Sequence, residues 1–252
     1  MKIVICGKGG SGKSTIATLL ANDFVAAGKK VVLVDTDESN KGLHRLVGTT
    51  PPRDLMDHLG GKKHVIEAMR SSPRESWPMN SLTKGFTLDY FPEAYVSRTR
   101  SVRLVSIGKI HDFGEGCACP MGMLAKTFLE GLTLAPDEVA LVDTEAGIEH
   151  FGRGVEERAD AVLMILDPSY ESVLLAKQVA ELVGVKGIPL YYLINKADEQ
   201  VADHIRSALS EDPRIVGVIR PDETILVSGL KGDSLVGGHP VTAAFVAKMV
   251  SG

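Results

Sequence analysis

Residues Lys2 to Ser14, with the sequence KIVICGKGGSGKS, decide the fold of this 252-residue chain. Residues 2–6 form a short apolar run with β-branched side chains, which is typical of a strand buried on both faces of a parallel sheet. Glycines follow at once, and apolar residues from Ile16 to Phe24 then repeat at helical spacing. Gly28 stands where helices commonly end. This opening predicts a strand, a glycine-rich loop and a helix.

The same alternation continues along the chain. Further buried strands are predicted at 31–34, 139–142, 161–166, 190–194 and 215–219, with helices between most of them, for instance at 172–183 and 200–209. Repeated strand and helix units predict an α/β fold, with a mostly parallel, doubly wound sheet flanked by helices. Two more strands are expected at 86–91 and 103–107, where an antiparallel edge strand can be accommodated.

The length fits one large α/β domain or two small ones. Because the alternation shows no internal repeat and no low-complexity linker, we expect a single domain over residues 1–252. The least regular part is 62–84, which mixes charges with two prolines and the lone tryptophan. We interpret it as a surface excursion.

Composition favours a cytoplasmic protein. Apolar residues make up 44% and charged residues 24%, and the net charge of -4 gives no general attraction to nucleic acid or anionic lipid. The first apolar run is too short for a signal peptide, and no run of about 18 apolar residues occurs. A predicted C-terminal helix at 241–250 carries a single lysine, too few for a basic membrane-binding helix. We therefore expect neither a nucleic-acid nor a membrane partner.

The loop from Gly7 to Ser14 has the Gly-x-x-x-x-Gly-Lys-Ser spacing of P-loop nucleotide hydrolases. Its glycines let backbone N–H groups converge on phosphate oxygens at a helix N-terminus. Lys13 supplies charge to the β and γ phosphates, and the Ser14 hydroxyl can ligate Mg²⁺. ATP is the favoured nucleotide. The predicted nucleotide-binding residues of this loop are Gly9, Gly10, Ser11, Gly12, Lys13, Ser14 and Thr15.

Lys8 separates this loop from the ordinary P-loop. The run from Lys8 to Ser14 resembles the deviant P-loop of the MinD, ParA, nitrogenase iron protein and ArsA class. The resemblance implies that Lys8 reaches across a homodimer to the partner's nucleotide and acts in catalysis with Lys13. On physical grounds alone it is one more cation for the γ-phosphate, and the alternative is a solvated surface lysine.

Two predicted strands end in carboxylates at the edge of the sheet where α/β proteins bind ligands. Resemblance to the same class makes Asp37, in Asp35-Thr36-Asp37, the catalytic residue that orients or deprotonates the attacking water. The alternative role for Asp37 is a turn or helix-capping aspartate. Asp143 precedes Thr-Glu-Ala-Gly147 and matches the carboxylate that holds magnesium through water in this class, at the start of a switch that senses the γ-phosphate.

Residues Asn195 to Asp198, Asn-Lys-Ala-Asp, have two interpretations. As Asn-Lys-x-Asp they resemble the guanine-reading motif of GTPases. MinD-type ATPases, in contrast, often use only the asparagine at this place to bind adenine, and Lys8 favours that interpretation. Resemblance to the class also makes Pro221 a contact to the base.

Cys117 and Cys119 are separated by one residue, just before a helix predicted at 121–132. An odd total of three cysteines disfavours a disulfide framework, and Cys6 is expected to be a buried structural thiol. Closed tetrahedral metal sites use four ligands, so the same pair from a second subunit would complete one. Four sulfurs could also hold Ni²⁺ in square-planar geometry or an iron–sulfur cluster. The alternative is an incidental pair of reduced thiols.

Two segments carry a closer resemblance. Gly116 to Gly122 and Asp143 to Gly154 look like the CooC family of ATPases, which assist nickel insertion into carbon monoxide dehydrogenase. The resemblance implies ATP hydrolysis, a nucleotide-controlled homodimer, Ni²⁺ or Zn²⁺ held between subunits by Cys117 and Cys119 of each, and carbon monoxide dehydrogenase as client. His111 and His150 are better explained as surface or packing residues than as further ligands.

Two other functions stay open. An iron–sulfur carrier or assembly ATPase would use the same four thiolates for a cluster. A spatial-organisation ATPase of the MinD or ParA type would bind a cellular surface under nucleotide control, although the net negative charge and the weakly charged C-terminus disfavour it.

Overall fold

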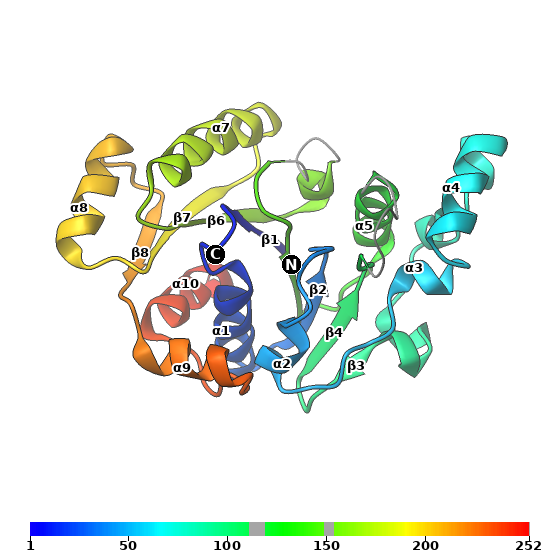
Figure 1. Ribbon diagram of the computed structural model, residues 1–252, viewed down its shortest axis with the longest axis horizontal. Helices are drawn as coiled ribbons and strands as arrows, with labels where there is room; N and C mark the ends of the chain where they lie inside the picture. Colours follow the sequence, from blue (N-terminus) through cyan, green and yellow to red (C-terminus); the bar gives the residue numbers. More distant parts are fainter. Residues whose placement is uncertain (111–118, 149–153, 252) are drawn as a thin grey trace.

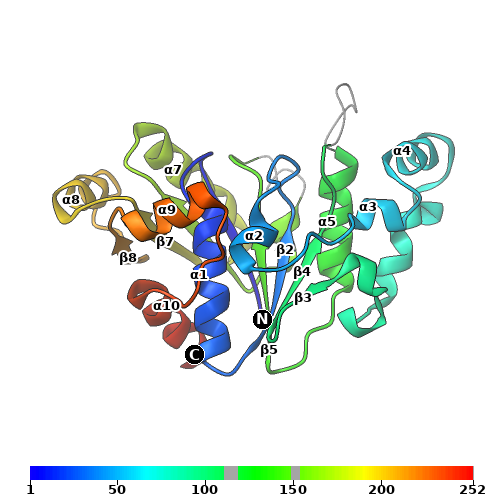
Figure 2. The same cartoon turned by 60° about the horizontal axis from the view of Figure 1, so that its bottom comes forward.

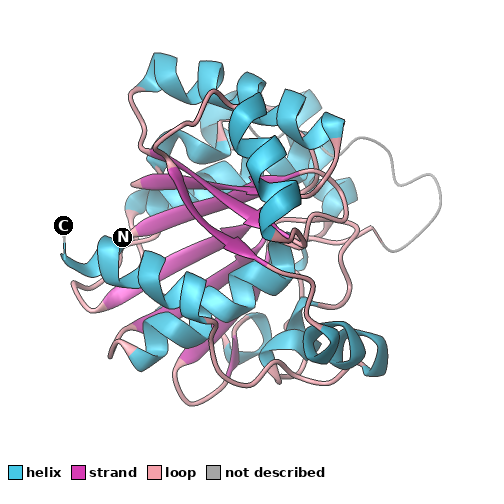
Figure 3. Ribbon diagram, turned by 90° about the vertical axis from the view of Figure 1, so that its left-hand side faces the viewer, coloured by secondary structure: helices cyan, strands magenta, loops and turns pink. Residues whose placement is uncertain are grey.

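The computed structural model describes residues 1–110, 119–148 and 154–251. These residues form an eight-stranded sheet that lies between two layers of helices (Figures 1 and 3). The strands are β1 (Lys2–Gly7), β2 (Lys30–Asp35), β3 (Ser97–Arg98), β4 (Val102–Ser106), β5 (Glu138–Asp143), β6 (Ala161–Leu166), β7 (Leu190–Asn195) and β8 (Ile215–Ile219). Their spatial order is β3-β4-β2-β5-β1-β6-β7-β8. Only β3 pairs antiparallel among these strands, which confirms the predicted α/β fold.

The helices predicted at 121–132, 172–183, 200–209 and 241–250 are all present, as α5, α7, α8 and α10. The α-helices are α1 (Lys13–Ala26), α2 (Leu43–Val47), α3 (Leu55–His58), α4 (Lys62–Ser71), α5 (Cys119–Gly131), α7 (Tyr170–Lys186), α8 (Glu199–Ala208), α9 (Glu223–Lys231) and α10 (Pro240–Ser251). Short 3-10 segments occupy Arg74–Ser76, Pro78–Lys84, Leu88–Tyr90, Glu93–Tyr95 and Val155–Arg158. Within the described ranges, none of the helices has the length and apolar character needed to cross a membrane.

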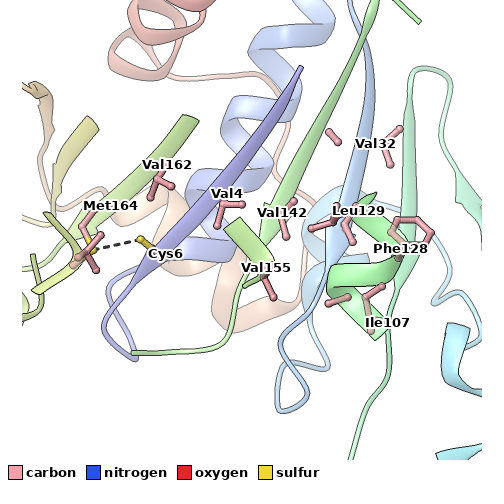
Figure 4. Close-up of a cluster of buried hydrophobic side chains, with 14 of the residues drawn as sticks. Val4, Cys6, Val32, Ile107, Phe128, Leu129, Val142, Val155, Val162 and Met164 are labelled. Atoms are coloured by element: carbon pink, nitrogen blue, oxygen red, sulfur yellow. Dashed lines mark hydrogen bonds between the residues drawn. The ribbon is translucent and has the colours of Figure 1, made fainter. Parts of the chain in front are cut away.

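The sheet divides the core into two clusters, and the central strand β1 contributes to both. Ile3 and Ile5 belong to the cluster beneath α1 and α10, which pack side by side (Figure 2). Val4 and Cys6 belong to the cluster on the opposite face, where Figure 4 shows them with the side chains of neighbouring strands. Successive side chains of a strand point to opposite faces, so an unbroken apolar run fits burial on both. Cys6 is buried as predicted, and its Sγ lies 3.6 Å from Sδ of Met164.

The strand predicted at 86–91 is wrong. Phe86 makes an isolated bridge with Leu132, and Leu88–Tyr90 is a 3-10 turn. The aromatic rings of Phe86 and Phe91 instead pack against Phe128 of α5, with ring centroids 5.2 and 6.1 Å from it. The apolar run therefore covers a helix, and the antiparallel edge strand is β3.

The segment 62–84 is more than a surface excursion. Val65, Met79 and Leu82 are buried in the core cluster that includes α5. A Cβ at Gly131 of α5 would lie 1.8 Å from the Leu82 carbonyl oxygen, so the backbones approach closely there. Few apolar residues among many charges concealed this packing role in the sequence.

Candidate nucleotide-binding site

The loop between β1 and α1 needs glycine for steric reasons. At Gly7, with φ of 147°, a Cβ would lie 2.5 Å from the Ile165 carbonyl oxygen of β6. At Gly12, with φ of 99°, a Cβ would lie 2.4 Å from Nδ2 of Asn195. Gly12 is also the N-cap of α1, and it gives the helix no side-chain hydrogen bond. The first N–H groups of α1 are therefore available to an anion.

The two loop lysines are placed differently. Lys13 is 7% exposed, and its Nζ donates to the Lys8 carbonyl oxygen at 3.4 Å. Lys8 turns toward its own chain, with Nζ 3.3 Å from Oδ2 of Asp167 and donating to Oγ of Ser169 at 3.1 Å. Ser169 is the N-cap of α7. Nothing in the sequence pattern indicated that Asp167 and Ser169 hold Lys8.

Ser14 and Asp143 meet at the start of α1. The Ser14 hydroxyl donates to Oδ2 of Asp143 at 2.5 Å, and Nδ2 of Asn40 donates to Oγ of Ser14 at 2.8 Å. Asp143 is fully buried, and its Oδ1 has no hydrogen-bond partner among the described residues. Burial raises the pKa of Asp143 to about 6, against the lowering effects of Ser14 and Lys13. An unpaired buried carboxylate oxygen beside a hydroxyl suits a hydrated cation.

Asp37 lies in the loop after β2 and forms a turn. Its Oδ1 accepts hydrogen bonds from Ser39 N at 2.9 Å, Ser39 Oγ at 2.7 Å and Asn40 N at 3.2 Å. These are the bonds of the turn aspartate considered as the alternative, and the catalytic role stays a prediction. The turn also places Asn40 against Ser14, a contact that sequence reasoning missed because it depends on how the loop folds back.

A buried ion pair lies behind this loop and was also missed. Asp35 is 4% exposed, and its Oδ2 lies 2.6 Å from Nζ of Lys109. Burial raises the pKa of Asp35 to about 7; Lys109 opposes the rise, and the neighbouring carboxylate of Asp143 adds to it. Asp35 and Asp143 are register partners at the ends of β2 and β5. The carboxyl groups of Asp35 and Asp143 are therefore buried next to each other at the ends of neighbouring strands.

A cavity of about 450 Å³ lies between the phosphate loop and α9, on the side of the phosphate loop away from Asp37. Thr15, Asn195 and Pro221, each predicted to bind nucleotide, all line it. Nδ2 of Asn195 donates to the Ser11 carbonyl oxygen at 2.8 Å, which ties this side to the phosphate loop. Asp198 does not line the cavity, and its side chain caps α8 by accepting from Val201 N at 2.9 Å. The Asn-Lys-x-Asp sequence thus directs its asparagine, not its aspartate, to the site.

The predicted metal site at the cysteine pair lies outside the described residues. Cys117 falls in the gap, and Cys119 opens α5 but its side chain is not part of the description. His111 and His150 also fall in the gaps. Among the residues that are described, no cluster of three or more His, Cys, Asp or Glu side chains could hold a metal ion.

The fold and the loop define the class of protein. Residues 2–235 match the family described as the CobQ/CobB/MinD/ParA nucleotide binding domain. The chain belongs to this family and is a P-loop ATPase.

Individual proteins within and around this family are also similar to the chain. The chain is 44% identical to an uncharacterized ATP-binding protein of Methanocaldococcus jannaschii, over 93% of this chain and 94% of the relative. It is 30% identical to the carbon monoxide dehydrogenase accessory protein CooC of Rhodospirillum rubrum, over 94% of this chain and 85% of that protein. Among solved structures, the septum site-determining protein MinD of Pyrococcus horikoshii, complexed with Mg-ADP, shares the fold with a TM-score of 0.69. That likeness spans 98% of this chain and 95% of the other at 15% identity, so it supports the fold alone.

Proposed function

We propose that this ATPase is a metallochaperone that dimerises on binding nucleotide and metal, and assists nickel insertion into carbon monoxide dehydrogenase. The observation that carries the proposal is its 30% identity to the CooC protein of Rhodospirillum rubrum along nearly the whole chain. The Cys-Ala-Cys sequence at 117–119 supplies thiolates suited to nickel or zinc, which we treat as cargo.

ATP binds along the loop and into the cavity beside it. The triphosphate lies on the backbone of residues 9–15, with Lys13 neutralising its charge. Adenine enters the cavity of about 450 Å³, where Asn195 and Pro221 contact it. The capping bond of Asp198 supports ATP over GTP, because a carboxylate engaged with Val201 is not directed at a base.

Ser14 and Asp143 are the residues that fit Mg²⁺. The Ser14 hydroxyl would hold the ion directly, and Asp143 would hold it through water with its unpaired Oδ1. Bound magnesium neutralises charge on the β and γ phosphates. The Ser14 oxygen has two lone pairs, so it could ligate the ion with one while it accepts the hydrogen bond from Asn40, at 2.8 Å, with the other.

Turnover uses Asp37 and the two loop lysines. Asp37 orients or deprotonates the attacking water, and Lys8 leaves Asp167 and Ser169 to reach the nucleotide of the second subunit. The closed homodimer brings two Cys117–Cys119 pairs together around Ni²⁺ or Zn²⁺. Loss of the γ-phosphate loosens the dimer and changes the thiolate geometry, which favours transfer to the apo-dehydrogenase.

The test measures metal content and oligomer mass together, on anaerobically purified protein, with and without ATP. Wild type is compared with Cys117→Ser/Cys119→Ser, and Cys6→Ala serves as the matched control because Cys6 is a buried thiol whose Sγ lies against Met164. We expect one metal ion per dimer in wild type and in the control, and none in the double variant. Equal metal binding in all three proteins would refute the proposal that this protein is a metallochaperone that holds metal with Cys117 and Cys119.

A second measurement separates the cargo and the client. Brown protein with broad visible absorption would identify an iron–sulfur carrier in place of a nickel protein. Apo-carbon monoxide dehydrogenase mixed with nickel, ATP and the wild-type protein should gain activity, and the gain should disappear with the double serine variant. If both proteins activate it equally, the proposed client is wrong.

A further inference from the structure

Two segments run side by side beyond the end of the sheet. β2 and β4 are neighbours (Figure 1), and their last register pair is Asp35 with Ser106. The chains stay together after this pair, since Ile110 N donates to the Glu38 carbonyl oxygen at 3.1 Å. The segment after β4 therefore accompanies the loop that holds Asp37.

Lys109 joins these segments through its side chain. The side chain is 11% exposed, and Nζ lies 2.6 Å from Oδ2 of Asp35. The same Nζ donates to the Asp37 carbonyl oxygen at 2.5 Å. Asp35 belongs to the strand and Asp37 to the loop, so one ammonium group holds both. This fixes where the Asp37 loop leaves the sheet.

Lys109 is itself anchored from the opposite side. Oδ2 of Asp54 accepts from Lys109 N at 3.0 Å, and Oδ1 of Asp54 accepts from Oγ of Ser106 at 2.6 Å. Asp54 is 7% exposed and immediately precedes α3. The lysine backbone is thus attached to the body of the protein, independently of the loop that its side chain holds.

Two contributions of Lys109 can be separated. It places a positive charge beside the buried carboxylate of Asp35, which otherwise faces the neighbouring Asp143. It also gives a hydrogen bond to the Asp37 carbonyl oxygen, which bears on the position of the loop. The first contribution concerns stability, and the second concerns the geometry of the site.

We propose that Lys109 is a positioning residue for ATP hydrolysis, which holds the Asp37 loop in register with the phosphate site without touching ATP. The proposal rests on the role assigned above to Asp37.

The first experiment compares Lys109→Met with Lys109→Arg and wild type. The methionine keeps an apolar stem but has no donor, so we expect kcat to fall about 10- to 100-fold, as for displaced catalytic groups. The dissociation constant for a non-hydrolysable ATP analogue should stay the same. Arginine should restore part of kcat, and Lys63→Met on the exposed face of α4 is the control for loss of a lysine. A wild-type kcat in Lys109→Met would overturn the proposal.

A second variant separates positioning from charge balance. Asp35→Asn/Lys109→Met removes the ion pair from both sides, so it also serves if Lys109→Met alone fails to fold. The Asp37 carbonyl still lacks its donor in this protein, and its kcat should stay well below that of Asp35→Asn. Equal kcat values in the double variant and Asp35→Asn would mean that Lys109 only balances charge, which overturns the proposal.

Asp37→Ala, measured in parallel, separates this proposal from the function on which it rests. A wild-type kcat in Asp37→Ala would refute the role of Asp37 itself. A low kcat in Asp37→Ala together with a wild-type kcat in Lys109→Met would refute the positioning role alone.

Discussion

The two sides of the phosphate loop are held by different interactions. We call the side that includes Asn195 and α9 the base side, and the side that includes Asp35 and Lys109 the switch side. On the base side, a cavity of about 450 Å³ is lined by α1 and α9, and Asn195 is tied to the loop backbone by one neutral hydrogen bond. On the switch side, a cavity of about 300 Å³ has Asp35, Asp54 and Lys109 in its wall. The charges of the switch side are buried or nearly buried and respond strongly to another charge, whereas charged residues that line the base side, such as Lys196 and Arg220, are exposed and screened by solvent. We infer that the base side sets nucleotide affinity and the switch side sets turnover.

The largest effect is expected at Lys13, which lies between the two sides. Lys13→Ala removes a nearly buried ammonium group that we propose binds the phosphates, so affinity and turnover should fall together. We expect kcat/KM to fall about 10²- to 10³-fold, as when a preorganised donor is removed. Steady-state ATPase assays and titration calorimetry measure both quantities. Lys84→Ala, at an exposed position, should behave as wild type; loss of kcat with wild-type affinity in Lys13→Ala would contradict the assignment.

Asp143→Asn tests the switch side through pH. The folded-state pKa of about 6 lies above the ordinary value of 3.8, so the folded protein binds this proton more tightly than the unfolded chain. The destabilising effect of the charged carboxylate is therefore absent below about pH 4 and grows until the pH exceeds about 6. Without nucleotide, Asp143→Asn should raise the free energy of unfolding at pH 8 by up to about 3 kcal/mol, at about 1.4 kcal/mol per pKa unit.

Denaturant unfolding at pH 4.5 and pH 8 measures the Asp143→Asn difference, with Glu67→Gln as an exposed control. The same substitution should weaken magnesium-dependent ATPase activity at both pH values. A stability gain that is equal at the two pH values would show that ionisation of Asp143 is not its source.

Asn195→Ala tests the base side alone. The substitution removes a hydrogen bond to the loop and a contact predicted for adenine. We expect the ATP dissociation constant to rise about 10-fold, which corresponds to about 1.4 kcal/mol, with kcat unchanged. Calorimetry with a non-hydrolysable analogue gives the first value, and ATPase assays at saturating ATP give the second. A fall in kcat with unchanged affinity would erase the distinction between the two sides.

The smallest effect is expected at Asp198. Asp198→Ala removes the N-cap of α8, which should cost about 1 kcal/mol of stability. The ratio of ATP to GTP affinity should not change, because the side chain points to Val201 N. Thermal unfolding and calorimetry with both nucleotides check these expectations. A tenfold shift toward ATP would instead identify Asp198 as a reader of guanine.

Much of the fold followed from the sequence because each of its signals is local. The run from Lys2 to Cys6 predicted a buried strand, and the glycines after it predicted a loop that leads into α1. The segment 86–91 failed for a physical reason: an apolar run has the same pattern whether it pairs in a sheet or covers α5. The buried residues of 62–84 were hidden for a different reason, because they are few and stand among many charged residues.

Some residues of the candidate site were predictable from local motifs, and others were not. The loop residues, Asn195 and Pro221 are placed together at one edge of the sheet, as their motifs indicated. Lys109 carried no signal, because its meeting with Asp35 depends on the parallel pairing of β2 with β4, strands that are far apart in the sequence. Asn40 was equally hidden, since a turn directs it to Ser14.

The contact between Gly12 and Asn195 also has an evolutionary consequence. Gly12 is restricted once by its backbone, with φ of 99°, and again by the amide that would meet any added Cβ at 2.4 Å. The asparagine in turn relies on the open space that glycine leaves beside the Ser11 carbonyl group. A lineage that replaced either residue would disturb the other, so we expect substitutions at Gly12 and Asn195 to occur together.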